Sequence, residues 1–219
     1  MNLLLRPLPK SSVGSKYVMA VTGLLLIGFV LAHMAGNLLI FAGREALNAY
    51  AHALEEKPPL LWTARVVLLA VFVLHIVLGI RLTCDNMRAR PIRYVCEDTV
   101  EANWASRHML LTGLVLLAFV VYHLLHFTFG SVHPDFVEGD VYHNVVAGFE
   151  VWPVSAFYIA AMIALGFHLY HGTWSMLQTL GLSHPRYNGI RNGLAGVLAV
   201  IIVIGNISIP VAVLAGLIH

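Results

Sequence analysis

Charged residues are scarce in this sequence. Asp, Glu, Lys and Arg together make up 11% of the 219 residues, whereas about a quarter of a soluble domain is charged. Hydrophobic residues make up 59%, and the mean hydropathy is +0.80. Segments with alternating polar and apolar residues, which are typical of transmembrane β-barrels, are also absent. The composition excludes a soluble globular domain and predicts an all-α integral membrane protein.

Cysteine is almost absent. The chain has only Cys84 and Cys96, and neither belongs to the CxxCH motif that attaches haem covalently. An iron–sulfur cluster needs about four cysteine ligands, so this chain does not supply one by itself. Both thiols fall on the predicted cytoplasmic side, where we expect them to be reduced and free.

Five apolar runs are long enough to cross a bilayer, whose hydrocarbon core takes about 20 residues of helix. They cover approximately residues 17–42, 61–83, 108–129, 154–180 and 193–218. The first run is too long for the apolar region of a signal peptide and has no convincing cleavage site, so we interpret it as a retained helix. The sequence therefore predicts one membrane domain, residues 1–219, with five transmembrane helices.

The basic residues predict the orientation of these helices, because cytoplasmic loops are enriched in Lys and Arg. With the N-terminus inside, all but three of the 13 basic residues lie on the inner side; the exceptions are Arg44, Lys57 and Arg65. The connection between the third and fourth helices contains acidic residues and no basic ones, as expected of an outer loop. We therefore expect an N-in, C-out topology.

Asp and Glu are missing from the middle of every run, but four histidines are found there: His33, His75, His123 and His168. Ionisable side chains inside a membrane are costly and generally functional. Successive helices run in opposite directions and rise about 1.5 Å per residue. His33 and His123 should therefore share an outer layer, and His75 and His168 an inner layer.

Two layers of paired imidazoles are typical of two bis-histidine haems, because neutral imidazole is a good ligand for haem iron. We predict a helix bundle that encloses two haems, held without covalent bonds as haem b. For a single intramembrane histidine, a hydrogen bond between helices would be a comparable explanation. Four histidines in two depth layers favour ligation.

Other residues near these histidines are candidate haem or propionate contacts: His126, His171, Gly36, Gly79 and Trp174. His126 and His171 each follow a predicted ligand by three residues, so either one is also an alternative ligand. Glycines beside the histidines, Gly28, Gly166 and Gly172 among them, leave room for a flat macrocycle, although glycine also permits close helix packing. We expect Asn37, Thr112 and Asn206 to bond their own backbone.

Several stretches resemble the membrane subunit of succinate:quinone oxidoreductases: GFVLAHMAGNLLIFAGREALNAYAHAL, FVLHIVLGI, FVVYHLLHF and GFHLYHGTWSMLQTLG. The similarity is to the single-chain, five-helix, two-haem cytochrome b of bacterial succinate dehydrogenases and fumarate reductases, and it covers essentially the whole chain. Its most specific parts are the order of the histidines and the HxxxGxWS segment from His168 to Ser175.

The resemblance implies His33 and His123 as ligands of the outer haem, and His75 and His168 as ligands of the inner haem. It also implies a bacterial cytoplasmic membrane location and two partners on the cytoplasmic face: a flavoprotein subunit with FAD and an iron–sulfur subunit. Those partners would interconvert succinate and fumarate, and this chain would exchange electrons with quinone. No nucleic-acid partner is implied.

For the quinone, the resemblance favours menaquinone over ubiquinone and a site near the outer haem, which indicates His52, Glu55 and Glu56. Some related fumarate reductases carry a glutamate on a proton route two residues before the fourth ligand. Here that position is Gly166, so the route is in doubt.

Two alternatives remain open. One is the dihaem cytochrome b of another quinone-linked enzyme, such as a hydrogenase or a formate dehydrogenase. A quinol:cytochrome c oxidoreductase fits less well, because it places two ligands on each of two helices. The other alternative is a haem-free anchor or transporter, for which we would expect broken helices or carboxylates at the membrane midplane.

Overall fold

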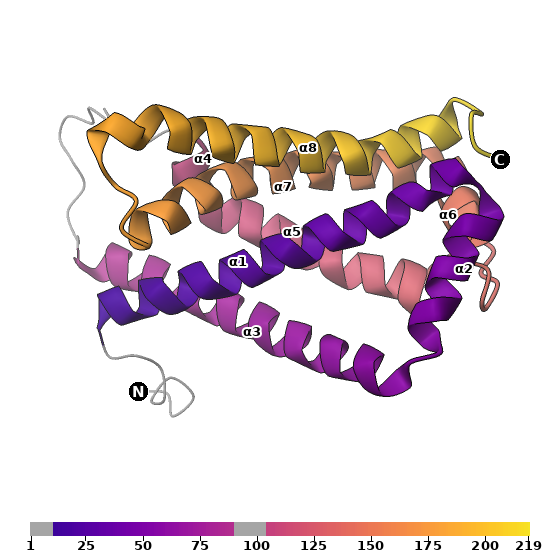
Figure 1. Cartoon of the computed structure of the whole chain (residues 1–219), viewed down its shortest axis with the longest axis horizontal. Helices are drawn as coiled ribbons and strands as arrows, with labels where there is room; N and C mark the ends of the chain where they lie inside the picture. The colour runs from indigo at the N-terminus through magenta and orange to yellow at the C-terminus, as the bar shows by residue number, and fades with distance from the viewer. Residues whose placement is uncertain (1–10, 90–103) are drawn as a thin grey trace.

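The computed structural model describes residues 11–89 and 104–219, and within them it contains helices and loops but no strand. Five segments are long and apolar enough to cross a membrane, which confirms the predicted all-helical membrane fold. They lie side by side and alternate in direction, and the first helix begins at the end of the bundle opposite to the C-terminus (Figure 1). The five main helices are α1 (Ser12–Asn37), α3 (Pro58–Ala89), α5 (Met109–His123), α7 (Trp152–Thr179) and α8 (Asn188–Leu214).

The surface of this bundle is suited to lipid. Large apolar side chains point outward along α3, where Leu60, Trp62 and Leu69 are each more than 60% exposed. The only buried residue of α3 is Leu78. A continuous apolar surface of this kind is unfavourable in water. In a bilayer the apolar side chains face lipid, and the helix forms its backbone hydrogen bonds within itself.

Two of the five crossing segments end in irregular helical turns. A 3-10 helix, η2 (Leu38–Ala42), continues α1, and a π-helical turn, η3 (Leu124–Thr128), continues α5. Both turns lie at the end of the bundle that carries the C-terminus, which we call the C-terminal end; the opposite end is the N-terminal end. The bounds of the five segments differ from the predicted runs by a few residues: α3 extends to Ala89, and α8 starts at Asn188 and stops at Leu214.

Shorter helices occur where the sequence analysis placed only connecting segments. They are α2 (Arg44–Glu55), α4 (Trp104–Arg107), α6 (Val141–Glu150) and the 3-10 turn η4 (Pro185–Tyr187). α2 lies across the C-terminal end of the bundle, close to α6 (Figure 1). The change of direction between η2 and α2 occurs at Gly43, whose φ of 101° is accessible mainly to glycine.

Asp140 joins α2 to α6. Its carboxylate accepts hydrogen bonds from the Asn48 amide at 2.9 Å and from Arg44 at 3.0 Å. It also accepts from the backbone N–H of His143 at 3.1 Å and so forms the N-cap of α6. The Asn48 side chain completes the link by accepting from the backbone N–H of Tyr142 at 2.9 Å. These bonds hold α2 and α6 together at the C-terminal end of the bundle.

Replacing Asp140 with Ala is expected to loosen α6, because loss of an Asp N-cap costs about 0.5–2 kcal/mol. Hydrogen–deuterium exchange of residues 141–150 should become faster, while exchange in α3 should not change. The hydrogen bond from Asn48 is the main cause that holds the pKa of Asp140 below its ordinary value of 3.8, and the backbone N–H of His143 and the charge of Arg44 add to it. The stabilisation is therefore present above that value and is lost as the pH falls through the folded-state pKa. Exchange in the D140A variant that equals the wild type at pH 7 would contradict this role.

Candidate functional site

The four intramembrane histidines meet in two pairs inside the bundle. The ring centres of His33 on α1 and His123 on α5 lie 5.8 Å apart, with an angle of 87° between the ring planes. The ring centres of His75 on α3 and His168 on α7 lie 6.4 Å apart, at 62°. These are the pairs that the depth calculation predicted.

The two pairs lie at different depths. The side chain of Thr22 contacts His75, and Thr22 precedes His33 by about three turns of α1, or roughly 16 Å along the helix. Thr112 contacts His168 and precedes His123 on α5 by a similar distance. The pair His33–His123 is therefore nearer the C-terminal end, and the pair His75–His168 is nearer the N-terminal end.

The spacing within each pair fits two ligands of one metal ion. A ligating histidine nitrogen lies about 2 Å from its metal, so two rings on opposite sides of one ion have centres roughly 6 Å apart. The observed 5.8 and 6.4 Å are close to that value. Two histidines on opposite sides of one ion are the axial set of a haem iron whose remaining ligands come from the macrocycle.

Aromatic and hydroxyl groups support the pair at the C-terminal end. Phe29 stacks on His33 with ring centres 5.4 Å apart, and Phe119 lies 5.7 Å from His123. The Tyr158 hydroxyl is 3.4 Å from Nδ1 of His123 and 3.1 Å from Nδ1 of His126. Side-chain contacts of this kind hold a ligand ring in one orientation.

His126 shares the Tyr158 hydroxyl with His123 and packs beneath α6. Its fully buried ring stacks on His133 at 4.8 Å and on Tyr122 at 5.4 Å. A Cβ placed on Gly148 of α6 would be 2.8 Å from its Cε1 atom, so the ring lies directly under α6. A π-helical turn follows His123 and changes the helical register at this point. The predicted role of His126 as a haem contact or alternative ligand remains a prediction.

The glycines divide into two groups. Gly36 packs against Tyr50, where a Cβ would be 2.6 Å from the ring, and Gly166 packs against Val203 of α8, where a Cβ would be 2.7 Å away. Both glycines therefore permit close packing, and room for a macrocycle beside them remains a prediction. By contrast, Gly23 and Gly113, which the sequence analysis missed, lie beside the rings of His75 and His168.

His171 and Trp174 lie near the N-terminal end of the bundle. Their rings are stacked with centres 6.0 Å apart. The guanidinium of Arg191 on α8 lies over the Trp174 ring, 4.5 Å from its centre. The predicted contact of these two residues, and of Gly79, with a haem remains a prediction.

The polar residues of the membrane interior were expected to bond their own backbone, and two of them do so. Asn206 donates to the carbonyl of Ile202, within its own helix. Thr112 donates to its own backbone as expected, but its hydroxyl oxygen also contacts His168 at 3.2 Å. The expectation for Thr112 was therefore incomplete.

The predicted quinone residues lie on α2 at the C-terminal end. Nδ1 of His52 is 3.7 Å from Oε2 of Glu55, and the side chains are 56% and 59% exposed. Glu56 is also exposed. An apolar pocket of about 290 Å³ lies in the same half of the bundle, between α5 and α7, and is lined by Tyr122, Pro153, Val154 and Phe157.

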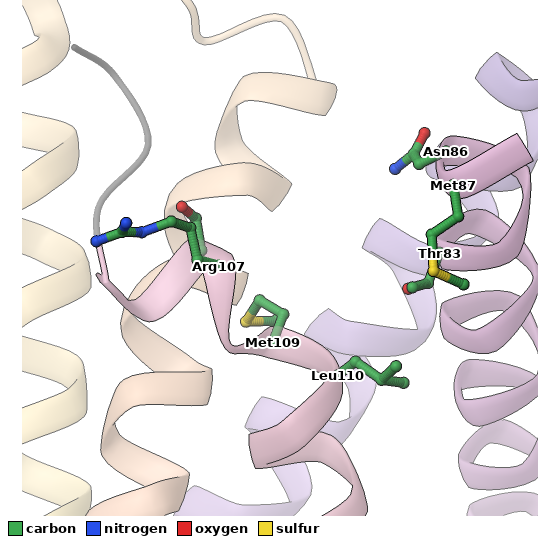
Figure 2. Close-up of a pocket in the computed structure, with 7 residues that line it drawn as sticks. Thr83, Asn86, Met87, Arg107, Met109 and Leu110 are labelled. Carbon is green, nitrogen blue, oxygen red and sulfur yellow. The ribbon is translucent and has the colours of Figure 1, made fainter. Parts of the chain in front are cut away.

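A second pocket, of about 390 Å³, lies at the N-terminal end. Figure 2 shows Thr83, Asn86 and Met87 of α3 on one side and Arg107 on the other. Arg107 lies at the end of the basic segment between the second and third crossing helices. Arg90 and Arg93 of that segment, and Cys96, lie outside the described residues.

A known protein resembles this chain over much of its length. Residues 99–207 match the family described as the succinate dehydrogenase/fumarate reductase transmembrane subunit. The chain belongs to this family. It is also 24% identical over 164 residues to the succinate dehydrogenase cytochrome b558 subunit of Bacillus subtilis (strain 168), which corresponds to 74% of this chain and 76% of that protein. No solved structure matches the chain.

Membership of the succinate dehydrogenase/fumarate reductase family identifies the chain as a cytochrome b type membrane subunit of an oxidoreductase complex. Together with the five apolar helices, it places the protein in the bacterial cytoplasmic membrane as a multi-pass protein.

Proposed function

We propose that this chain is the membrane-anchor and electron-transfer subunit of a succinate dehydrogenase/fumarate reductase complex and that it binds two haems b. His33 and His123 would ligate one haem, and His75 and His168 the other. The observation that carries this proposal is the pairing of four buried histidines from four helices at metal-ligand spacing. Each haem, when bound, supplies a one-electron redox couple within the membrane.

Two arginines near the N-terminal end are suited to bind the carboxylates of the inner haem. Nη1 of Arg81 is buried and has no hydrogen-bond partner among the described residues, and Arg81 lies about 9 Å along α3 from His75. Nε of Arg191 is also buried and unpaired within the described part of the chain. A buried donor without a partner costs roughly 1–3 kcal/mol, and an anionic ligand group would remove that cost.

We place the N-terminal end of the bundle on the cytoplasmic side, with a flavoprotein subunit carrying FAD and an iron–sulfur subunit docked there. Basic side chains concentrate at this end, where Lys16, Arg88 and Arg186 accompany the pocket around Arg107. The excess of Lys and Arg supports the N-in, C-out orientation.

The quinone, menaquinone rather than ubiquinone, is assigned to the C-terminal end. His52 and Glu55 form a solvent-accessible pair that can accept or release a proton, with Glu56 beside them. The apolar pocket next to Tyr122 and Phe157 is near the lower limit of about 300 Å³ for ligand sites and lies in the same half of the membrane.

The test is a dithionite-minus-ascorbate optical spectrum of the purified membrane complex, combined with pyridine haemochrome quantitation. We expect two haems b for each copy of this chain. One haem per chain would mean that one of the two histidine pairs does not bind haem. A colourless preparation would contradict the cytochrome function and would favour a haem-free anchor.

A further inference from the structure

Helices α1 and α5 carry the same residue pattern. Each contains Met-x-x-Thr-Gly-Leu, beginning at Met19 in α1 and at Met109 in α5. In each, a phenylalanine and then the ligand histidine follow at identical spacing, so that Thr22 corresponds to Thr112 and His33 to His123. The repeated spacing means that the two helices present the same groups at the same two depths.

The repeated Thr-Gly pair makes the same contact twice. Oγ1 of Thr22 lies 3.1 Å from Nδ1 of His75, and Oγ1 of Thr112 lies 3.2 Å from Nδ1 of His168. A Cβ placed on Gly23 would be 3.5 Å from Cε1 of His75. At Gly113 the corresponding distance to His168 is 3.6 Å. Each ring of the pair nearer the N-terminal end therefore rests against a threonine hydroxyl and a glycine of the neighbouring helix.

The hydroxyl hydrogen of each threonine is directed to its own helix. Thr22 donates to the carbonyls of Val18 at 2.9 Å and Met19 at 3.0 Å. Thr112 donates in the same way to residues 108 and 109, at 3.1 Å each. A hydroxyl has a single hydrogen; with that hydrogen donated to its own helix, the oxygen accepts from the histidine.

A hydroxyl oxygen that accepts requires the histidine to carry its proton on Nδ1. The unprotonated nitrogen is then Nε2, which is the atom available to a metal. Both threonines are nearly completely buried, at 4% and 5% exposure, so water does not compete for these hydrogen bonds. The backbone of α1 and of α5 thereby selects the tautomer of a histidine on the adjacent helix.

We propose that Thr22 and Thr112 are positioning residues that fix the tautomer and ring orientation of His75 and His168 and so set the redox properties of the inner haem. This rests on the proposed function, in which His75 and His168 are its ligands. Among the described residues no threonine contacts the pair at the C-terminal end: His33 stacks on Phe29, and His123 has the longer 3.4 Å contact to Tyr158. The two haem sites are therefore built differently.

The experiment compares Thr22→Val and Thr112→Val, which keep the side-chain shape, with Thr22→Ser and Thr112→Ser, which keep the hydroxyl. The matched control is Thr63→Val, because Thr63 on α3 bonds only the carbonyl of Pro59 and is exposed to the lipid side. All variants are studied as the full purified complex. The measurements are the electron paramagnetic resonance g values of the oxidised haems, the two midpoint potentials, and haem retention in detergent.

In each valine variant we expect altered g values and a higher midpoint potential for one haem only, because a histidine without a hydrogen-bond acceptor donates less charge to oxidised iron. The double valine variant should hold that haem about 10–100-fold less tightly. The serine variants and Thr63→Val should match the wild type.

Unchanged g values, potentials and retention in the valine variants, with two haems per chain, would overturn this proposal and leave the proposed function intact. Serine variants as disturbed as the valine variants would also overturn it, because the effect would then arise from packing rather than from the hydrogen bond. A wild-type complex without haem would instead contradict the proposed function.

Discussion

Replacing any one of His33, His75, His123 or His168 with leucine is expected to remove one haem from each chain, or to leave it five-coordinate and high-spin. In the proposed function each pair of rings would hold one haem, so the loss of one imidazole would leave that haem with a single protein ligand. Pyridine haemochrome quantitation and low-temperature spectra of the four variants measure the effect. The variants at His33 and His123 should lose one spectral component, and those at His75 and His168 the other.

Two control variants make this prediction specific. His126→Gln should keep both haems, because the His126 ring packs under α6 and against His133. His184→Gln, at an exposed position before η4, should also keep both. The ligand assignment would be wrong if His126→Gln lost a haem and His123→Leu did not. The pairing would be wrong if His33→Leu and His75→Leu lost the same component.

Introducing a single methyl group at Gly166 is expected to destabilise the contact between α7 and α8. In Gly166→Ala the new Cβ would lie 2.7 Å from Cγ2 of Val203. Valine has little rotamer freedom in a helix, so the helices themselves must separate. Overpacking of this kind costs about 1–3 kcal/mol. The midpoint of thermal unfolding of the purified complex in detergent should fall.

The second-site variant Val203→Ala should restore stability when combined with Gly166→Ala, because it removes the atom that clashes. Gly193→Ala on α8 is the matched control: a Cβ there meets nothing within 4 Å, and alanine favours helix over glycine by about 1 kcal/mol. If Gly166→Ala were as stable as Gly193→Ala, the proposed close contact would be absent. The same contact explains why a glutamate does not fit at this position without displacing α8.

The sequence alone was sufficient for the five membrane-spanning helices and for the two histidine pairs. In lipid a helix must satisfy every backbone hydrogen bond within itself, so long apolar runs leave few alternatives. Depth follows from the constant rise of a helix, which is why His33 could be paired with His123, and His75 with His168, by counting residues. Neither inference requires knowledge of how the helices are rotated about their axes.

The short helices and the direction of individual side chains depended on tertiary structure. α2 and α6 have 12 and 10 residues, and helices of this length are stable mainly through packing. In this protein α2 and α6 are held together through Asp140.

The positions of His126, Gly36 and Gly166 depended on a π-helical turn and on helix rotation, neither of which the hydrophobic pattern specifies. Thr112 shows most clearly which contacts the sequence predicts and which contacts the packing decides. Its bond to its own backbone follows from its place in a helix. Its contact with His168 exists only because the packing of α5 against α7 turns that side of the helix toward the histidine. The sequence by itself determined which residues lie at which depth, because the rise of a helix is constant, and the tertiary structure decided which of them face each other, because rotation is set by packing between helices.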